Sequence, residues 1–236
     1  MLLSIIVPVF NEEQNIGILI EKLLKLDFSQ TNLDKEIIVV NDGSNDRSLE
    51  IIKKFEKIKI INQNNLGKGR AVQNGIKIAE GDYVLIQDGD LEYNPEDIIS
   101  MCNVVETSQM MSIYGSRYKP LYLNILPRYY KNQNLTSYLA NILFMLLFMF
   151  LYFRFISDPL TGYKLYSREF FMNNTIHSMG FEADHEITAK LIKQKYKIIE
   201  IPVSYKPRTK EEGKKINFFD ALKAMVTIIK YRFLNK

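Results

Sequence analysis

The chain has 236 residues, of which 47% are hydrophobic and 25% are charged, and its formal net charge is +4. This length suits one substantial α/β domain and excludes two full-sized domains joined by a linker, while the ordinary composition excludes an extended disordered tail. The mild charge, with no long Lys/Arg run interleaved with aromatic residues, argues against nucleic acid as a partner.

A single cysteine, Cys102, excludes an intramolecular disulfide framework and a thiolate metal site, which fits a reducing compartment. The first ten residues lack a basic segment and contain Pro8 after a short apolar run. They therefore predict a first strand rather than a signal peptide. We expect the protein to remain in the cytoplasm.

The first hundred residues alternate β-branched runs with helical patterns, which is typical of βαβ units. Strands are expected over residues 2–9, 36–40, 58–61 and 83–87. Helices are expected over the segment from Ile16 to Leu24 and over residues 44–57 and 68–79. The pattern predicts an α/β fold with a mostly parallel central sheet flanked by helices. Ligands bind beyond the carboxyl ends of such strands, so the polar loops there define a candidate cleft.

The second half of the chain contains a long uncharged segment, residues 132–153, which ends in an unbroken apolar run over residues 142–153. A membrane-crossing helix needs about twenty apolar residues. The run is shorter than that, so it favours a helix in the protein core or one lying in the membrane interface over a membrane span.

The last twenty residues alternate large apolar side chains with lysine and arginine, which predicts a basic amphipathic helix. We expect a main domain over residues 1–216 and this helix over residues 217–236. The helix either docks on the protein core or attaches to anionic lipid.

Paired carboxylates follow the strand expected at residues 83–87. Asp88, Gly89 and Asp90 come directly after it, and Glu92 follows shortly afterwards. Carboxylates at alternate positions can converge on one hard cation, and Mg²⁺ or Mn²⁺ bridging a diphosphate needs only a few such ligands. Gly89 would let a bulky phosphate approach the backbone. A solvated turn is the alternative for this motif on its own.

Three other loops contribute polar groups to the same edge. After the second strand, Asp42 can accept hydrogen bonds from a ribose or a base edge, although a turn with a helix cap is the better explanation of this motif on its own. Residues 10–13, Phe-Asn-Glu-Glu, follow the first strand, and Lys68 lies between two glycines where a helix N-terminus could face phosphate. The P-loop and dinucleotide-binding spacings are both missing, which argues against an ATPase and a dinucleotide dehydrogenase.

Seven segments, spread over about residues 3–216, together carry a resemblance to a known family. In order they are SIIVPVFNEEQNI, EIIVVNDGSNDRS, NNLGKGRAVQNGIKIAEGDYVLIQDGDLEYNPEDI, YGSRY, SDPLTGYKLYSRE, GFEADHEITAK and IIEIPVSYKPRTKEEGKK. The chain resembles the family 2 glycosyltransferases, in the dolichol-phosphate mannosyltransferase-like or polyprenyl-phosphate glycosyltransferase branch. The resemblance implies a nucleotide-diphospho-sugar transferase fold of the GT-A, Rossmann-like type.

The resemblance also implies a reaction. The enzyme would transfer a sugar, with inversion, from a GDP- or UDP-sugar to a membrane-linked acceptor, most simply a polyprenyl or dolichyl phosphate. It would work at a membrane surface on the cytoplasmic face, with residues 1–216 as its catalytic domain. The sequence does not predict the sugar, the base or the oligomeric state.

Roles on the donor side follow from the same resemblance. Pro8, Phe10 and Glu12 would hold the nucleotide, and Asp42 would face its base or ribose. Lys68 is expected close to the donor phosphates because of its position before the third helix and not because of the resemblance.

The metal and the diphosphate would be held by the paired carboxylates. Asp88 and Asp90 would be the principal ligands, and Glu92 would complete the metal shell where relatives often have glutamine. The chain departs from better-known members, which often have Asp-Ala-Asp where this sequence has Asp-Gly-Asp, and this leaves the donor open.

Three basic residues match phosphate-binding positions of the family. Arg117 would lie near the acceptor phosphate, and Arg208 and Lys214 match a basic pair on a loop that closes over the donor phosphates. A guanidinium gives a planar, bidentate grip on phosphate, whereas lysine supplies a point charge.

The acceptor side stays open between two chemistries. A lipid phosphate is already anionic and needs no strong base, whereas a sugar hydroxyl needs a carboxylate to take its proton, with Glu182, Asp184 or Glu186 as candidates. These three side chains could equally belong to a helix N-terminus. Asp158 and Lys164 border the acceptor side in the family.

Two other functional classes remain at this point. The chain could be a noncatalytic nucleotide-sugar binding or scaffold protein, although such a protein has no need of Arg208 and Lys214. It could also be a nucleotidyltransferase, but the glycine-rich basic stretch expected after the first strand is replaced by FNEEQN.

Overall fold

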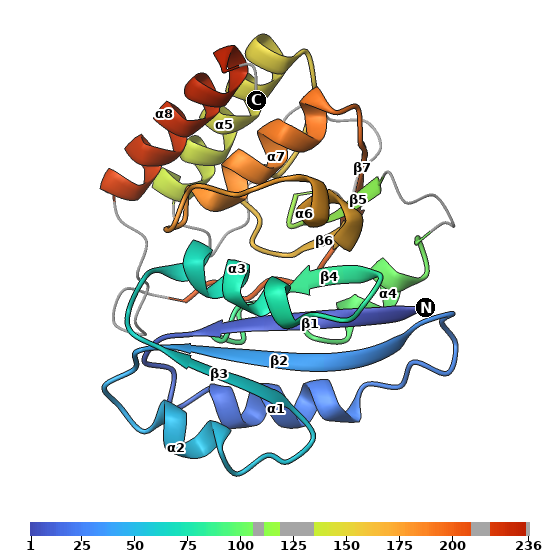
Figure 1. Cartoon of the computed structure of the whole chain (residues 1–236). Coiled ribbons are helices and arrows are strands. Elements are labelled where there is room, and N and C mark those ends of the chain that lie inside the picture. The colour runs from blue at the N-terminus through green and yellow to red at the C-terminus, as the bar shows by residue number, and fades with distance from the viewer. Residues whose placement is uncertain (106–110, 119–134, 209–217, 235–236) are drawn as a thin grey trace.

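A seven-stranded sheet organises the computed structural model, which describes residues 1–105, 111–118, 135–208 and 218–234 (Figure 1). The strands are β1 (Leu2–Val9), β2 (Asp34–Asp42), β3 (Lys59–Gln63), β4 (Tyr83–Ile86), β5 (Met111–Ser116), β6 (Lys164–Ser167) and β7 (Lys197–Pro202). The helices are α1 (Ile16–Lys25), α2 (Ser48–Ile52), α3 (Lys68–Ile78), α4 (Asp97–Cys102), α5 (Leu135–Tyr152), α6 (Arg168–Asn173), α7 (Ala183–Lys193) and α8 (Phe218–Phe233).

The strand order is β3-β2-β1-β4-β6-β5-β7. Strands β1 to β4 are parallel to their neighbours within that group, and β5 pairs with β7 in parallel. Strand β6 joins the two groups and is antiparallel to both β4 and β5. The expected mostly parallel sheet is confirmed, with one antiparallel strand that the local pattern did not reveal.

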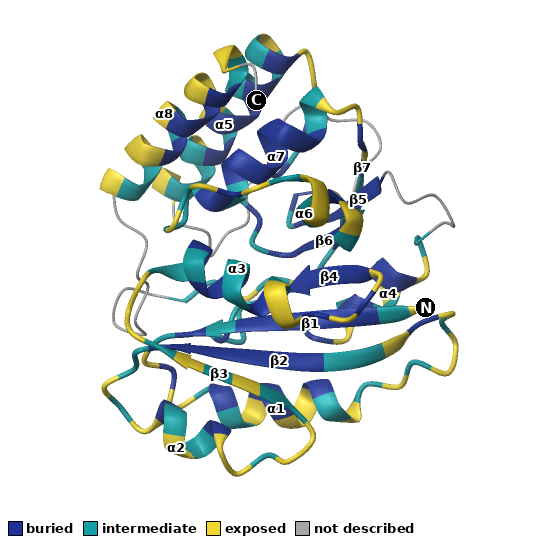
Figure 2. Cartoon of the chain, viewed as in Figure 1, coloured by how far each residue is buried: buried dark blue, intermediate teal, exposed yellow. Residues whose placement is uncertain are grey.

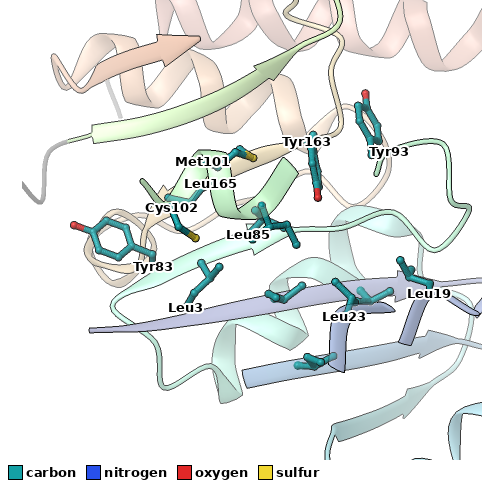
Figure 3. Packing of buried hydrophobic residues seen from close by; sticks show 14 of the residues in the cluster. Leu3, Leu19, Leu23, Tyr83, Leu85, Tyr93, Met101, Cys102, Tyr163 and Leu165 are labelled. Atoms are coloured by element: carbon teal, nitrogen blue, oxygen red, sulfur yellow. The ribbon is translucent and has the colours of Figure 1, made fainter. Parts of the chain in front are cut away.

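The period-two pattern of β1 divides its side chains between two layers. Leu3, Ile5 and Val7 join the core that contains α1, part of which is drawn in Figure 3. Ile6 points to the opposite face and joins Ala71 of α3 in a second cluster. In Figure 1, α1 and α2 accordingly lie below the strands and α3 lies above them.

The helix expected over residues 44–57 is wrong at both ends, because α2 spans only Ser48–Ile52. The residues before it are bonded to the loop after β1 instead of to one another. Asn45 donates its backbone N–H to Oδ1 of Asn11 at 2.8 Å, and Arg47 donates its own to Oε2 of Glu13 at 2.9 Å. Such side-chain acceptors compete with the helical hydrogen bonds.

The apolar run of the second half lies in α5, which has the length and composition of a membrane-crossing helix. One face of it is buried in the protein, through Asn141, Phe144, Met145, Phe148 and Tyr152. Asn141 donates from Nδ2 to the carbonyl oxygen of Ser157 at 2.9 Å. The helix is therefore fixed to the core along this face.

The C-terminal helix α8 packs beside α5 and α7. Ala224, Ile228 and Tyr231 are buried in the cluster that these helices share. The Tyr152 hydroxyl donates to the carbonyl oxygen of Ile228 at 2.7 Å. One face of α8 is thus docked on the core, and Figure 2 shows exposed residues along its other side.

We expect Gly75→Ala to lower the free energy of unfolding by about 1–3 kcal/mol. Gly75 lies in α3, and an added Cβ would lie 2.6 Å from Cγ2 of Ile6, so the helix would have to move away from the sheet. Urea denaturation followed by circular dichroism measures the change. Lys77→Ala, at an exposed position of the same helix, is the control and should shift stability by less than about 0.5 kcal/mol. Unchanged stability of Gly75→Ala would mean that this interface adapts.

Candidate functional site

The loops after β1 and β2 are bonded together at the carboxyl edge of the sheet. Asn11 donates its N–H to Oγ of Ser44 at 3.0 Å, and Glu12 donates its own to Oγ of Ser48 at 2.8 Å. Asn11 has a φ of 52°, in the left-handed region that asparagine tolerates better than most residues. These bonds fix the backbone of Glu12 beside the end of β1.

Pro8, Phe10 and Gly89 lie along the same edge. Pro8 is opposite Val40 in the β1–β2 register, and Phe10 is partly buried directly after β1. A Cβ built on Gly89 would lie 3.4 Å from the carbonyl oxygen of Pro8, which is ordinary contact. The protein itself therefore does not demand glycine here, and space for a phosphate stays a prediction.

Asp42, at the end of β2, is bonded to its own neighbourhood. One carboxylate oxygen accepts from Nε2 of Gln63 at 2.7 Å and from the N–H of Leu66 at 2.8 Å, and the other accepts from the N–H of Gly67 at 2.9 Å. The side chain thus holds the loop that leads into α3. Its contact with a ribose or base stays a prediction.

Asp88 forms an ion pair with Lys68, the first residue of α3. Oδ1 of Asp88 lies 2.6 Å from Nζ of Lys68, and Asp184 lies 4.0 Å from the same nitrogen. Burial would lower the pKa of Lys68, but the charges of Asp88 and Asp184 raise it above its usual value. This lysine stays positively charged between the two carboxylates.

Gly162 lies against the same carboxylate. A Cβ at this position would lie 2.5 Å from Oδ2 of Asp88, a distance that side-chain atoms do not tolerate. The turn before β6 is thus packed directly on the paired carboxylates. The local sequence carries no signal for this contact, because Gly162 and Asp88 lie far apart in the chain.

Arg208 forms ion pairs with three further acidic side chains of the site. Its Nη2 lies 2.8 Å from Oδ2 of Asp90, its Nη1 lies 3.1 Å from Oε2 of Glu12, and its Nε lies 3.5 Å from Oε1 of Glu92. Burial, and then the charges of Asp88 and Glu92, raise the pKa of Asp90 against the opposing effect of Arg208. One guanidinium therefore binds three carboxylates that come from two loops.

The expected metal ligands are close enough to interact, yet they are paired with cations. In the part of the chain that the structure describes, no group of three or more His, Cys, Asp or Glu side chains is arranged to hold a metal ion. The ligand chemistry nevertheless fits Mg²⁺ or Mn²⁺, which prefer carboxylate oxygens. Burial, and then the neighbouring carboxylates, raise the pKa of Asp90, and a bound cation would favour its ionised form. A bound ion would compete with Lys68 and Arg208.

Lys214, the expected companion of Arg208, lies outside the described residues. The segment before it is described as far as Arg208, whose N–H donates to Oε1 of Glu92 at 2.9 Å. The role of Lys214 stays a prediction.

Arg117 and Asp158 form a buried, two-pronged ion pair on the expected acceptor side. Nε of Arg117 lies 2.7 Å from Oδ2 of Asp158, and Nη2 lies 2.7 Å from Oδ1. Asp158 is completely buried, and its charge outweighs desolvation to hold the pKa of Arg117 well above its usual value. Asp158 therefore fixes the plane of the guanidinium.

Glu200, on β7, holds the turn that carries Asp158. Its Oε1 accepts from the N–H of Ser157 at 2.9 Å and from the N–H of Asp158 at 3.1 Å. Burial raises the pKa of Glu200. We did not predict this residue from the sequence, although a charged side chain within the apolar run IIEIP was a signal for it.

Lys164, at the start of β6, is completely buried next to the acceptor side. Its Nζ donates to the carbonyl oxygen of Pro159 at 3.4 Å and lies 4.9 Å from the centre of the Tyr114 ring. Burial lowers its pKa. Lys164 was expected to border the acceptor side. The structure places it beneath the site rather than at its surface.

The three candidate general bases differ in their surroundings. Glu186 is buried, pairs with Lys190 at 2.7 Å and accepts from the N–H of His177, so it serves the packing of α7. Glu182 accepts from the N–H of Gly180 at 3.1 Å at the start of that helix. Asp184 is the one that lies beside Lys68 in the site.

His185 follows Asp184 on α7 and is 6% exposed. Its ring centre lies 5.0 Å from that of Phe144 on α5, and its Nδ1 has no hydrogen-bond partner among the described residues. Burial, and then the charge of Lys164, lower its pKa to about 3. The imidazole is neutral in the folded protein.

The sequence is similar to a known family and to several curated proteins. The sequence model of the protein family described as "Glycosyl transferase family 2" matches residues 4–174 of this chain. The dolichol-phosphate mannosyltransferase of Pyrococcus furiosus is 30% identical over 220 residues, which cover 91% of this chain and 59% of that protein. The dodecaprenyl-phosphate galacturonate synthase of Rhizobium johnstonii is 34% identical over 139 residues, which cover 55% of this chain and 41% of that protein. The chain thus spans less than two thirds of the length of either relative.

A solved structure shares the fold. The crystal structure of glucosyl-3-phosphoglycerate synthase from Mycobacterium tuberculosis, in complex with Mn²⁺, uridine diphosphate and phosphoglyceric acid, superposes with a TM-score of 0.73 at 16% identity. The match covers 99% of this chain and 79% of that one. It confirms the expected GT-A, Rossmann-like fold.

The neutral state of His185 predicts a pH dependence of stability. Because its folded-state pKa of about 3 lies below the ordinary 6.5, its contribution is complete above pH 6.5 and is lost as the pH falls toward 3. At pH 5 we expect this group to have cost about 2 kcal/mol of the free energy of unfolding. Urea titrations at pH 7 and pH 5 measure the loss. Between pH 7 and pH 5, the free energy of unfolding of His185→Gln should fall by about 2 kcal/mol less than that of the unmodified protein. Equal losses in the two proteins would contradict a neutral, buried His185.

Proposed function

The chain belongs to glycosyl transferase family 2, and from this premise we propose that it moves a sugar, with inversion, from a nucleotide-sugar donor to a polyprenyl phosphate at a membrane surface. The observation that carries the proposal is the pairing of Asp88 with Lys68 and of Asp90 with Arg208 at the carboxyl edge of the sheet. Relatives named for transfer to dolichol phosphate and dodecaprenyl phosphate support the acceptor class.

On the donor side, Asp88, Asp90 and Glu92 would hold Mg²⁺ or Mn²⁺. The ion would supply positive charge to the diphosphate of a GDP- or UDP-sugar as it leaves. Lys68 and Arg208 already lie among these carboxylates, so each could turn from a carboxylate to a phosphate oxygen as the charge moves. Such preorganised charges stabilise a leaving diphosphate without a proton donor.

On the acceptor side, Arg117 would orient the lipid phosphate. Its plane is fixed by Asp158, and Asp158 is held in turn by Glu200, so the guanidinium is preorganised. A phosphate oxygen is anionic near neutral pH and can attack the anomeric carbon without a base. The engagement of Glu182 and Glu186 with their own helix fits an acceptor that needs none.

Transfer to a sugar hydroxyl is the alternative. Asp184 would then have to remove the proton, because it is the candidate base that lies beside Lys68. Its carboxylate, however, already lies 4.0 Å from Nζ of Lys68 and is thus engaged with a cation of the donor side. The phosphate acceptor is therefore the reading that the site favours.

Contact with the membrane is proposed through α5 and α8. These two helices pack side by side and leave large apolar side chains exposed, with Leu139 and Phe150 on α5 and Val226 and Phe233 on α8. Lys223 and Lys230 are exposed on α8 and would attract anionic lipid headgroups. The pair would lie on the cytoplasmic face with its apolar side chains in the interface.

We expect Asp90→Asn to abolish transfer while leaving the fold intact, because the charge of this side chain holds the cation. The assay measures nucleoside diphosphate released from nucleotide sugars when Mg²⁺ or Mn²⁺ and an extracted polyprenyl phosphate are present. Asp34→Asn, at the exposed start of β2, is the matched control and should keep full activity. Undiminished turnover by Asp90→Asn would defeat the metal assignment, and release of pyrophosphate would indicate a nucleotidyltransferase.

Binding to vesicles should depend on the exposed apolar stripe of α8, which includes Val226 and Phe233. Replacing Val226 and Phe233 together by serine removes two large apolar side chains, 56% and 73% exposed, and should weaken binding to vesicles containing anionic lipid by at least about tenfold. Cosedimentation measures the bound fraction. Met172→Ser, at a 72% exposed position on α6, is the control and should bind normally. If the double variant sediments like the original protein, the stripe does not contact lipid.

A further inference from the structure

Tyr205 lies between the donor carboxylates and the acceptor arginine, and the transfer proposed above assigns it no role. It follows β7 and is partly buried. Its hydroxyl touches Glu92 and its ring touches Arg117, so a single side chain contacts both halves of the site.

The hydroxyl fixes Glu92. It donates to Oε2 of Glu92 at 2.8 Å, while Oε1 accepts from the N–H of Arg208 at 2.9 Å. The segment from Tyr205 to Arg208 thus holds both oxygens of this carboxylate.

The ring supports Arg117. The guanidinium carbon of Arg117 lies 4.9 Å from the centre of the Tyr205 ring, within the range of a cation–π contact. The bonds to Asp158 fix the edge of the same guanidinium. The ring limits motion out of the guanidinium plane, which those bonds leave less restricted.

The backbone makes this arrangement stiff. Tyr205 forms an antiparallel bridge with Tyr93, and the two rings lie 5.1 Å apart. Lys206 donates its N–H to the carbonyl oxygen of Glu92 at 2.8 Å. The loop after β4 and the segment after β7 are therefore joined next to the side chains that Tyr205 contacts.

We propose that Tyr205 is a positioning residue that sets Glu92 and Arg117 relative to each other, its hydroxyl serving the metal and donor side and its ring serving the acceptor side. The inference deepens the proposed function and rests on it for the identity of the two ligands. Two substitutions can separate the hydroxyl contact with Glu92 from the ring contact with Arg117. Phenylalanine at position 205 keeps the ring and loses the hydroxyl, whereas leucine loses both.

The test compares Tyr205→Phe and Tyr205→Leu in the full chain by two binding measurements that need no turnover. Calorimetric titration of Mn²⁺ in the presence of UDP or GDP reports the donor side. Binding of farnesyl phosphate, a short isoprenoid phosphate, reports the acceptor side. Both variants should bind Mn²⁺ about tenfold more weakly, as expected when a partner that orients a metal ligand is lost. Only Tyr205→Leu should also weaken farnesyl phosphate, by about three- to tenfold.

Tyr196→Phe removes a hydroxyl just before the start of β7, at the opposite end of the strand from Tyr205, and is the control, with both affinities unchanged. Where turnover is measurable, the KM for polyprenyl phosphate should rise in Tyr205→Leu and stay constant in Tyr205→Phe. Mn²⁺ affinity unaltered in Tyr205→Phe, or acceptor affinity equally reduced in both variants, overturns the inference. Failure of the unmodified protein to transfer sugar to any polyprenyl phosphate would defeat the proposed function, while the two titrations would still decide the role of Tyr205.

Discussion

Carboxylates gathered at one edge of the sheet repel one another, and they can share a partly buried space only if cations lie among them. Parallel strands create the problem, because β1 and β4 end side by side and deliver Glu12 and Asp88 to the same place. The cations come from elsewhere in the chain. Lys68 begins α3, and Arg208 arrives from beyond β7 to contact three acidic side chains. The second half of the sheet thus completes the charge balance that the first half requires.

The first half of the fold could be predicted because its signals are local. Short apolar, β-branched runs between helical patterns located β1 to β4, and the polar loops that follow these runs located Asp88 and Asp90. The helix expected at residues 44–57 failed because Asn11 and Glu13, more than thirty residues away, accept the hydrogen bonds of the backbone there. The antiparallel direction of β6 was not predicted for a related reason, since its pairing with β4 joins segments that are remote in the sequence.

The candidate site shows the same division between residue types and their partners. Arg117 and Asp158 could both be named from their motifs, but their pairing joins two separate segments and carries no local signature. The close approach of Gly162 to Asp88 also joins separate segments, and only the packed structure reveals it. The sequence therefore predicted which residue types the site contains. It did not predict which of them contact one another, because those contacts join distant segments of the chain.

The single amide in the apolar helix α5 has a practical consequence for handling this protein. Because Asn141 donates a hydrogen bond to the carbonyl oxygen of Ser157, the helix cannot rotate about its long axis without breaking that bond. Leu139, Leu143 and Phe150 must therefore stay turned away from the core. A variant with glutamine or lysine at those three positions would be a rational starting point for detergent-free purification and crystallisation, since it replaces apolar side chains that are 54%, 45% and 68% exposed.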